Sequence, residues 1–293
     1  MKAILFVNSK KPHSRNLGKE IAVELESRNI VVETHSFGEK TAFLPVNGYD
    51  LAFSLGGDGT VLYAARAMSP LQVPIFPVNL GTFGFIAGVE PLKWREVFER
   101  WQDGKATLSR RIMLEIWVER GKKYVFQGSC LNDVIVSSSG ASRLINLRLS
   151  SGEGDMKEAI KLGSYRSDAL IISTPTGSTA YSAAAGGPIV DPELEAFVLS
   201  PVCPFTLTHR PMVLSANETI MVEVDEKQRS GIILILDGQV TVKLKGGDRV
   251  YIKKAPYPCM LIESGRSGFF EALRTKLSWA GEEPQPEDDV GKR

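Results

Sequence analysis

The chain changes its pattern of apolar and polar residues near residue 105. Before that point, short apolar runs alternate with longer stretches whose apolar residues have helical spacing. The apolar runs are 3–7, 30–32, 51–55 and 74–78, and the helical stretches lie around 18–26, 61–68 and 92–101. Alternation of strands and helices is typical of a parallel sheet covered by helices. Residues 1–105 are therefore expected to form an α/β domain with a parallel sheet.

Beyond residue 105, apolar residues alternate with polar ones over seven short segments. These segments are 113–118, 124–127, 144–149, 220–224, 232–236, 240–244 and 250–253. A period of two residues predicts half-buried strands, so residues 106–267 are expected to form a β-rich, sandwich-like domain. Residues 269–279 have helical spacing, and we expect this C-terminal helix to pack back on the first domain and complete it at about 268–281. The polar, charged and proline-containing segment 282–293 is expected to be a flexible tail.

Length and composition agree with two folded domains. At 293 residues the chain exceeds the size of most single-core domains. Its 35 Lys and Arg residues nearly balance 34 Asp and Glu residues, so neither nucleic acid nor a membrane is expected as a partner. No stretch approaches 18 apolar residues and the run 3–7 is too short for a signal peptide, which predicts a cytoplasmic location. Three cysteines and three histidines are scattered, which favours neither a disulfide framework nor a zinc site.

A glycine-rich turn, Gly56-Gly57-Asp58-Gly59-Thr60, joins the apolar run 51–55 to a helical stretch. Its glycines remove side chains where a polyphosphate must approach the backbone, and they permit positive φ angles. The amides of the turn and the positive end of the helix would then face the anion. A carboxylate beside phosphates must either hold a metal ion or take a proton from an incoming hydroxyl. Asp58 is therefore the candidate catalytic residue.

The same residue types also form ordinary tight turns, in which Asp58 would only cap the helix. The chain offers its own comparison, because Gly246-Gly247-Asp248 lies between two strand-like runs. A hairpin turn is enough there and no helix follows, so this second occurrence is not interpreted as a phosphate site. For the first turn, both interpretations are left open by these residues alone.

Hydroxyl-bearing and small residues are concentrated in the run Ser173-Thr174-Pro175-Thr176-Gly177-Ser178-Thr179-Ala180-Tyr181-Ser182. The run follows the apolar strand 169–172 and precedes the small residues 183–188. Small side chains let a flat ligand lie close to the backbone, and hydroxyl groups donate and accept hydrogen bonds. Tyr181 can stack on a ring or bond to a ribose. On its residues alone, this run predicts a polar wall for a ligand.

Four segments together resemble the NAD kinase family, in order and approximate spacing along nearly the whole chain. They are the turn 56–60, the motif Asn79-Leu80-Gly81-Thr82-Phe83-Gly84-Phe85, the pair Asn132-Asp133 and the run 173–188. The turn is shared with diacylglycerol kinases and phosphofructokinases, whereas 174–182 is specific for NAD kinases. The resemblance implies a phosphate-donor-binding α/β domain, an NAD-binding β-sandwich-like domain and an active site between them. It also implies that ATP phosphorylates the 2′-hydroxyl of the adenosine ribose of NAD to give NADP, with a divalent cation such as Mg²⁺.

Residue by residue, the resemblance implies that Asp58 is the general base. The positions that it implies for NAD binding are Asp58, Gly59, Phe85, Asn132, Asp133, Arg143, Arg166, Asp168, Thr176, Thr179, Ala180, Tyr181, Ser182, Ala183, Ala184 and Gln239. The phosphate-donor loop would be Gly56, Gly57, Gly59 and Thr60. No metal ligand is assigned. Members of the family usually form dimers or tetramers through the β domain, so a homo-oligomer is expected.

Two positions depart from the family pattern. Asp133 stands where a glutamate is common and has a shorter reach, and Ala169 adds a methyl group where glycine usually follows the aspartate. Arg166 bears on the choice between NAD and NADH, because a fixed cation discriminates between ligands of different charge. The direction is open, since a cation beside the nicotinamide ring would repel the oxidised form.

Ordinary structural explanations also exist for several of these residues. Asp133 can end a turn, Arg166 and Asp168 can form an exposed ion pair on one strand face, and Phe85 can belong to the core. Two other functions are weighed for the whole chain: a lipid or sugar kinase on the same scaffold, and a non-catalytic dinucleotide sensor. The lipid kinase predicts an exposed apolar or basic membrane face, which the periodicity does not show. The sensor predicts loss of Asp58 or its glycines, and all of them are present.

Overall fold

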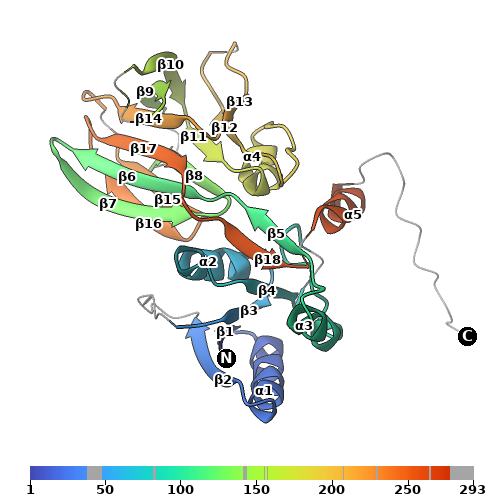
Figure 1. Ribbon diagram of the computed structural model, residues 1–293. Coiled ribbons are helices and arrows are strands. Elements are labelled where there is room, and N and C mark those ends of the chain that lie inside the picture. Colours follow the sequence, from blue (N-terminus) through green and yellow to red (C-terminus); the bar gives the residue numbers. More distant parts are fainter. Residues whose placement is uncertain are drawn as a thin grey trace, which may run out of the picture.

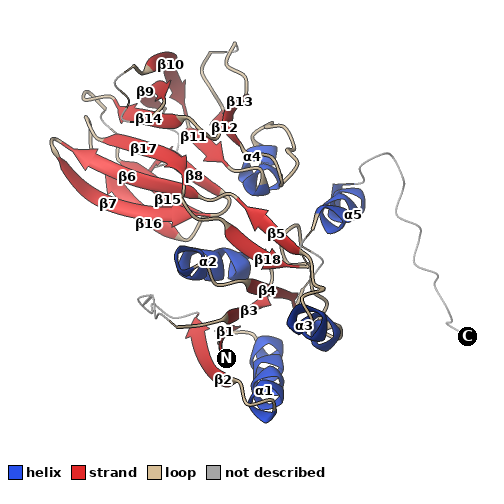
Figure 2. Cartoon of the chain, viewed as in Figure 1, coloured by secondary structure: helices blue, strands red, loops and turns tan. Residues whose placement is uncertain are grey.

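The computed structural model describes residues 1–37, 48–81, 84–140, 144–154, 156, 158–206, 208–228, 230–263 and 265–277. These residues form three six-stranded sheets, one in the lower half of Figure 1 and two in the upper half. Helices surround the first sheet, whereas the other half consists almost entirely of strands (Figure 2). No helix in the described part of the chain is long and apolar enough to span a membrane.

The first sheet has the strand order β2-β1-β3-β4-β18-β5. Its strands are β1 (Lys2–Asn8), β2 (Val31–Phe37), β3 (Leu51–Gly56), β4 (Ile75–Asn79), β5 (Leu108–Arg111) and β18 (Cys259–Ile262). Its helices are α1 (Pro12–Ser27), α2 (Asp58–Met68), the short η1 (Ser69–Leu71) and α3 (Trp94–Gln102). Strands β1 to β4 pair in parallel, and every residue of β3 and β4 is buried because both faces of the sheet are covered. The predicted α/β half with a parallel sheet is confirmed.

The other two sheets are antiparallel and pack face to face. One has the order β10-β9-β14-β17-β6-β7, and the other has the order β13-β12-β11-β8-β15-β16. The first comprises β6 (Leu114–Arg120), β7 (Lys123–Cys130), β9 (Ile145–Gly152), β10 (Ile160–Ser167), β14 (Thr219–Val224) and β17 (Arg249–Lys254). The second comprises β8 (Asp133–Ser138), β11 (Ala169–Ser173), β12 (Ala196–Val202), β13 (Met212–Ser215), β15 (Ile232–Leu236) and β16 (Val240–Leu244). One core cluster joins buried residues of both sheets, such as Val118 and Val136, so the predicted sandwich-like fold is confirmed.

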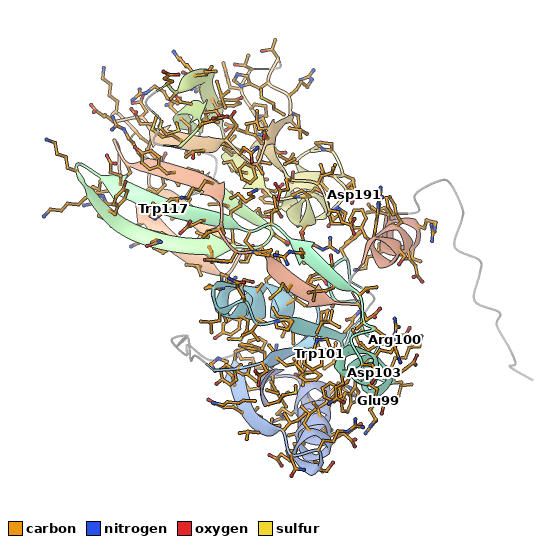
Figure 3. The ribbon with its side chains drawn as sticks, viewed as in Figure 1. Glu99, Arg100, Trp101, Asp103, Trp117 and Asp191 are labelled. Atoms are coloured by element: carbon orange, nitrogen blue, oxygen red, sulfur yellow. The ribbon has the colours of Figure 1, made fainter. Side chains whose placement is uncertain are left out.

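Helix α5 (Arg266–Leu277) follows β18 and packs back on the first half, as expected. The ring of its buried Phe269 lies 6.2 Å from the ring of Phe85. Arg266 Nε lies 2.7 Å from Asp191 Oδ2, and Figure 3 shows Asp191 beside this helix. The segment 282–293, predicted to be a tail, lies outside the described residues.

The first sheet includes two strands that the sequence pattern placed in the β-rich half. Strand β18 pairs with β4 in parallel and with β5 in antiparallel orientation. Each of the two strands has four residues, which is too short for periodicity to tell which sheet it joins. The first sheet therefore extends beyond the predicted limit at residue 105.

The two halves of the chain meet at helix α2. The glycine turn links the carboxyl end of β3 to this helix, at the edge where open α/β sheets bind ligands. In the sandwich, Asp133 at the start of β8 pairs with Ser173 at the end of β11. Arg66 of α2 bonds to Asp237, the residue after β15, so this edge of the sandwich adjoins the helix. The fold thus brings the glycine turn to the segments around Asp133 and Ser173.

Phe53 is expected to be a major contributor to the stability of the first half. Its fully buried ring stacks on Phe76 at 4.9 Å and meets Trp94 edge-on at 6.1 Å. Phe53→Ala should lower the free energy of unfolding by about 3–5 kcal/mol, because it removes buried apolar area and leaves a cavity. Urea denaturation followed by tryptophan fluorescence measures the loss. Val23→Ala, at an exposed position of α1, is the control and should change stability by less than about 0.5 kcal/mol; equal effects of the two substitutions would contradict this packing.

Candidate active site

The carboxylate of Asp58 is held by three backbone amides. The amide of Phe85 donates to Oδ2 at 3.0 Å, and the amides of Ile86 and Ala87 donate to Oδ1 at 3.2 and 3.0 Å. A carboxylate has about four acceptor positions, so these bonds leave roughly one open, on Oδ2. Asp58 is the first residue of α2 and Gly57 is the N-cap, without a side-chain capping bond. The interpretation of Asp58 as a helix cap is therefore wrong.

Close approach explains two of the glycines around Asp58, Gly56 and Gly84. A Cβ atom on Gly84 would lie 2.0 Å from Asp58 Oδ1, so only glycine lets the segment after it reach the carboxylate. A Cβ atom on Gly56 would lie 2.1 Å from Thr60 Oγ1. Gly56, Gly57 and Gly59 are all in the described part of the chain, and none of them adopts a positive φ. The positive φ angles that these glycines permit are therefore not used in this turn, whereas Gly56 and Gly84 need a bare backbone for close approach.

The run 173–182, called the wall segment below, packs directly against the residues that precede β8. Thr174 Oγ1 donates to the carbonyl of Leu131 at 2.6 Å and accepts from the amide of Gly177 at 3.1 Å. A Cβ atom on Gly177 would lie 2.1 Å from the carbonyl oxygen of Asn132. Glycine is therefore needed at position 177 for the two segments to pack together.

Three buried polar atoms in these segments have no hydrogen-bond partner within the described residues. They are Asn132 Oδ1, Ser173 Oγ and Thr176 Oγ1, the last on the short helix η2 (Thr176–Thr179). Buried polar atoms are nearly always bonded in folded proteins, so unbonded ones are candidates for an additional partner. Asn132 and Thr176 were predicted to bind NAD.

Asp133, at the start of β8, and Asp237, the residue after β15, form a buried acidic pair. Burial, together with the nearby charge of Asp237, raises the pKa of Asp133 to about 7. Burial also raises the pKa of Asp237, while Arg66 acts in the opposite direction. Asp133 begins a strand and is almost completely buried, so it does not end an exposed turn.

Residues after the wall differ in what their side chains contact. Tyr181 begins the short helix α4 (Tyr181–Ala184) and is half exposed, as is Ala184 at its other end. Ser182 is buried, with its hydroxyl 3.0 Å from that of Ser200, so this hydroxyl is used within the fold. Thr179 Oγ1 donates to the carbonyl of Thr176 at 3.3 Å. Ala180 and Ala183 are partly exposed.

Arg166 and Asp168 lie at the opposite end of β11 from the wall. The five residues of β11, which span about 17 Å, separate Asp168 from Thr174, and Arg166 lies two residues before Asp168, on β10. Arg166 is exposed and its guanidinium lies 4.7 Å from the ring centre of Phe205. No ion pair joins Arg166 to Asp168 in the structure as described, so the expected alternative of a paired strand face is wrong. Arg143 lies outside the described residues.

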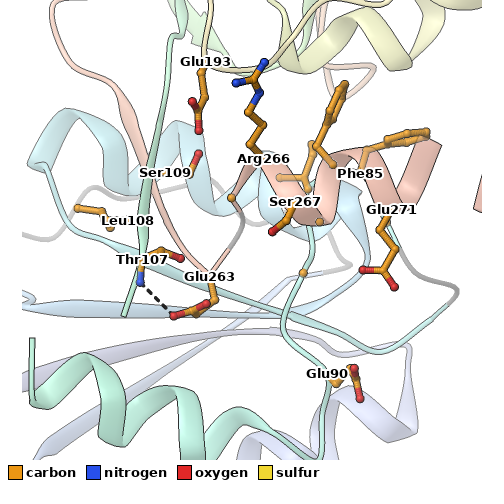
Figure 4. Close-up of a pocket in the computed structure, with 16 residues that line it drawn as sticks. Phe85, Glu90, Thr107, Leu108, Ser109, Glu193, Glu263, Arg266, Ser267 and Glu271 are labelled. Atoms are coloured by element: carbon orange, nitrogen blue, oxygen red, sulfur yellow. Dashed lines mark hydrogen bonds between the residues drawn. The ribbon is translucent and has the colours of Figure 1, made fainter. Parts of the chain in front are cut away.

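Phe85 packs on helix α5 beside a polar cavity (Figure 4). Lys276 Nζ lies 5.4 Å from the centre of its ring. The cavity has a volume of about 580 Å³ and is lined by residues 84–86, by the first residues of α5 and by four glutamates. The segment that holds Asp58 therefore has a cavity along part of its length.

Sequence reasoning missed Arg66 and Asp237, which connect the glycine turn to the wall. Gln239, a predicted site residue, lies beside the turn, where its Nε2 donates to the carbonyl of Gly59 at 2.8 Å. One available signal was a single charged residue, Arg66, within an otherwise apolar stretch of helix. The other was the Asp-Gly pair between two alternating runs, where Asp237 has a positive φ of 50°.

Comparison with known proteins agrees with this arrangement of two halves. Residues 4–106 match the model of the ATP-NAD kinase N-terminal domain, and residues 131–264 match that of the ATP-NAD kinase C-terminal domain. The NAD kinase of Treponema denticola is 41% identical over 283 residues, which cover 96% of this chain and 98% of that protein. The NAD kinase of Geobacter sulfurreducens is 37% identical over 286 residues, covering 95% and 98%.

Two solved structures share the fold. Yeast NADH kinase, complexed with NADH, has a TM-score of 0.83 at 22% identity and covers 98% of this chain and 90% of its own. An NAD kinase from Archaeoglobus fulgidus, in complex with ATP, has a TM-score of 0.73 at 25% identity and covers 94% and 99%. With both halves matched and 41% identity to a relative over nearly its full length, this chain belongs to the NAD kinase family.

Proposed function

We propose that this chain transfers the terminal phosphoryl group of ATP to the 2′-hydroxyl of the adenosine ribose of NAD, forming NADP. The main support is the Asp58 carboxylate, which three amides hold with one acceptor position open. Family membership supports the choice of substrates, since the relatives are NAD kinases and one solved relative is in complex with ATP.

Asp58 acts as the general base. A ribose hydroxyl is a far weaker acid than a carboxylic acid, so the proton must leave as the new bond to phosphorus forms. The three amides fix the carboxylate, and its open position accepts the hydrogen bond from the hydroxyl. Positioning and charge neutralisation supply most of the catalysis in phosphoryl transfer. The exposed amide ends of the glycine turn and the positive end of α2 face the donor phosphates.

A divalent cation is proposed to come with the donor and not to be held by a cage of side chains. Within the described residues, no group of three or more His, Cys, Asp or Glu side chains could hold a metal ion. Mg²⁺ is often bound mainly through substrate phosphates and water. It would supply charge neutralisation on the phosphates, and the chemistry assigned to Asp58 does not depend on it.

NAD is proposed to lie against the wall segment. Asn132 Oδ1 and Thr176 Oγ1 are among the buried polar atoms without a partner in the described residues, and the hydroxyl and amide groups of a dinucleotide supply such partners. Tyr181 is exposed enough to stack on a ring. Ser182 contributes shape instead of a hydroxyl, since its oxygen contacts Ser200.

A homo-oligomer is proposed to complete the NAD site. Arg166 and Asp168 lie at the other end of β11, a strand that spans about 17 Å, from the wall, so they do not line the same surface as Thr176 within one copy. A second copy of the chain would bring them to the NAD bound on the wall. Cys130, Cys203 and Cys259 are free thiols, which suits the proposed cytoplasmic location because thiols stay reduced there.

ATP-dependent formation of NADP from NAD tests the proposed function directly. The purified chain should form NADP, measured with an NADP-specific dehydrogenase, and should not phosphorylate diacylglycerol or fructose 6-phosphate. Binding of NAD without NADP formation would support a sensor and reject the proposal.

Asp58→Asn should lower turnover by roughly 10² or more, the scale of general-base catalysis, with a smaller effect on the KM for NAD. The asparagine amide cannot take the proton. Thermal melting checks that the variant is folded, because its NH₂ group would face an amide donor. Asp103→Asn, an exposed aspartate after α3, is the control and should keep wild-type turnover. Turnover near the wild-type rate in Asp58→Asn would reject the general-base assignment.

Asp133→Asn should change how stability depends on pH. The pKa of Asp133 is about 7 in the folded protein against an ordinary value of 3.8, so the folded state binds this proton more tightly. The contribution of this group to the free energy of unfolding of the wild type therefore falls as pH rises from about 4 to about 7. Asp133→Asn removes this titration and should become progressively more stable than the wild type over that interval. Urea denaturation across it, with Asp103→Asn as control, measures the difference; a difference that does not vary with pH would contradict the raised pKa.

A further inference from the structure

Arg66 connects the helix that begins at Asp58 to the end of the sandwich. It lies roughly two turns after Asp58 on α2. Its Nη1 donates to Asp237 Oδ2 at 3.1 Å, and its Nη2 donates to Gln239 Oε1. The Arg66 side chain is 15% exposed and that of Asp237 is fully buried. This guanidinium therefore uses two nitrogens to bind two acceptors in the other half of the chain.

Asp237 in turn accepts hydrogen bonds from the segment that carries predicted NAD contacts. Its Oδ1 accepts from the amide of Asn132 at 2.8 Å and, more weakly, from that of Asp133 at 3.4 Å. Its Oδ2 accepts from the amide of Leu131 at 3.1 Å, in addition to Arg66. A buried carboxylate is costly unless its acceptor positions are filled, and these donors fill them. The position of residues 131–133 is thus tied to Arg66.

Gln239 links Arg66 to the glycine turn by hydrogen bonds. Its Oε1 accepts from Arg66 while its Nε2 donates to the carbonyl of Gly59 at 2.8 Å. Both ends of this amide are therefore engaged with the protein. A continuous chain of hydrogen bonds runs from the residue after Asp58, through Gln239, Arg66 and Asp237, to residues 131–133.

We propose that Arg66 is a positioning residue for phosphoryl transfer, which sets the distance between Asp58 and the NAD bound at Asn132 and Asp133; this role rests on the proposed function. Arginine is required because its planar group reaches two acceptors at fixed angles. Lysine keeps the charge beside Asp237 but cannot hold Gln239 in the same geometry. A misplacement of about 1 Å between reacting groups costs up to 10²-fold in rate.

The test compares Arg66→Lys and Gln239→Leu with a matched ion pair elsewhere in the chain. Arg120 pairs with the buried Asp248 through Nε at 2.8 Å and Nη2 at 2.7 Å, in the hairpin turn of the sandwich. Arg120→Lys therefore disturbs an arginine paired with a buried aspartate without a connection to the glycine turn. Arg66→Lys and Gln239→Leu should lower kcat about 10-fold or more, with KM for NAD and ATP changed less than about threefold. Arg120→Lys should lower the melting temperature and leave kcat unchanged.

The double variant Arg66→Lys with Gln239→Leu distinguishes a single connection from two separate effects. Both substitutions break the same chain of bonds, so the double variant should lose little more kcat than Arg66→Lys alone. Fully multiplicative losses would overturn the proposal. A raised KM with unchanged kcat would also overturn it, because that pattern indicates a direct substrate contact.

Amide hydrogen exchange gives a readout that does not need activity. Arg66→Lys should speed exchange of the amides of residues 131–133 and leave that of residues 85–87 unchanged, since the latter bond to Asp58. Unchanged exchange at 131–133 would overturn the positioning role. Failure of the wild type to form NADP would reject the proposed function instead, while the exchange result would still report on the connection.

Discussion

The Asp58 carboxylate accepts hydrogen bonds from the amides of Phe85, Ile86 and Ala87, on a segment that Gly84 allows to come close. Three backbone donors on one carboxylate leave it little freedom to move. They fasten the start of α2 to the segment that follows β4, at the carboxyl edge of the parallel sheet. The other parts of the site are positioned from this helix, so its fixed start determines where they lie.

The second constraint is the buried ion pair between α2 and the sandwich. Burying Arg66 and Asp237 costs solvation free energy, and such pairs contribute little net stability. Their value lies in geometry, because each buried charge has its partner in only one arrangement of the two halves. Burial and the nearby charge of Asp237 also raise the pKa of Asp133, and no cation among the described residues acts against them. Burial of these groups thus costs folding stability and fixes the positions of the polar groups in the site.

Local features of the fold and site were predictable from sequence. Strand β3, the glycine turn and α2 are contiguous, so apolar runs and glycine spacing suffice to predict them. The partners of Asp58 lie 27 to 29 residues away, and Arg66 and Asp237 are 171 residues apart. No local pattern links such positions, because tertiary packing alone brings them together. The short strands β5 and β18 were misassigned for the same reason, since pairing with β4 decides their sheet.

The most direct test of the central claim is the single-turnover rate of NADP formation by Asp58→Glu. Glutamate keeps the charge and basicity of the carboxylate but extends it by one methylene, beyond the position that the amides of residues 85–87 fix. We predict a rate at least about 10²-fold below that of the wild type, with NAD binding changed only a few-fold. A rate near that of the wild type would contradict the claim that a carboxylate held in one position takes the proton from the ribose hydroxyl.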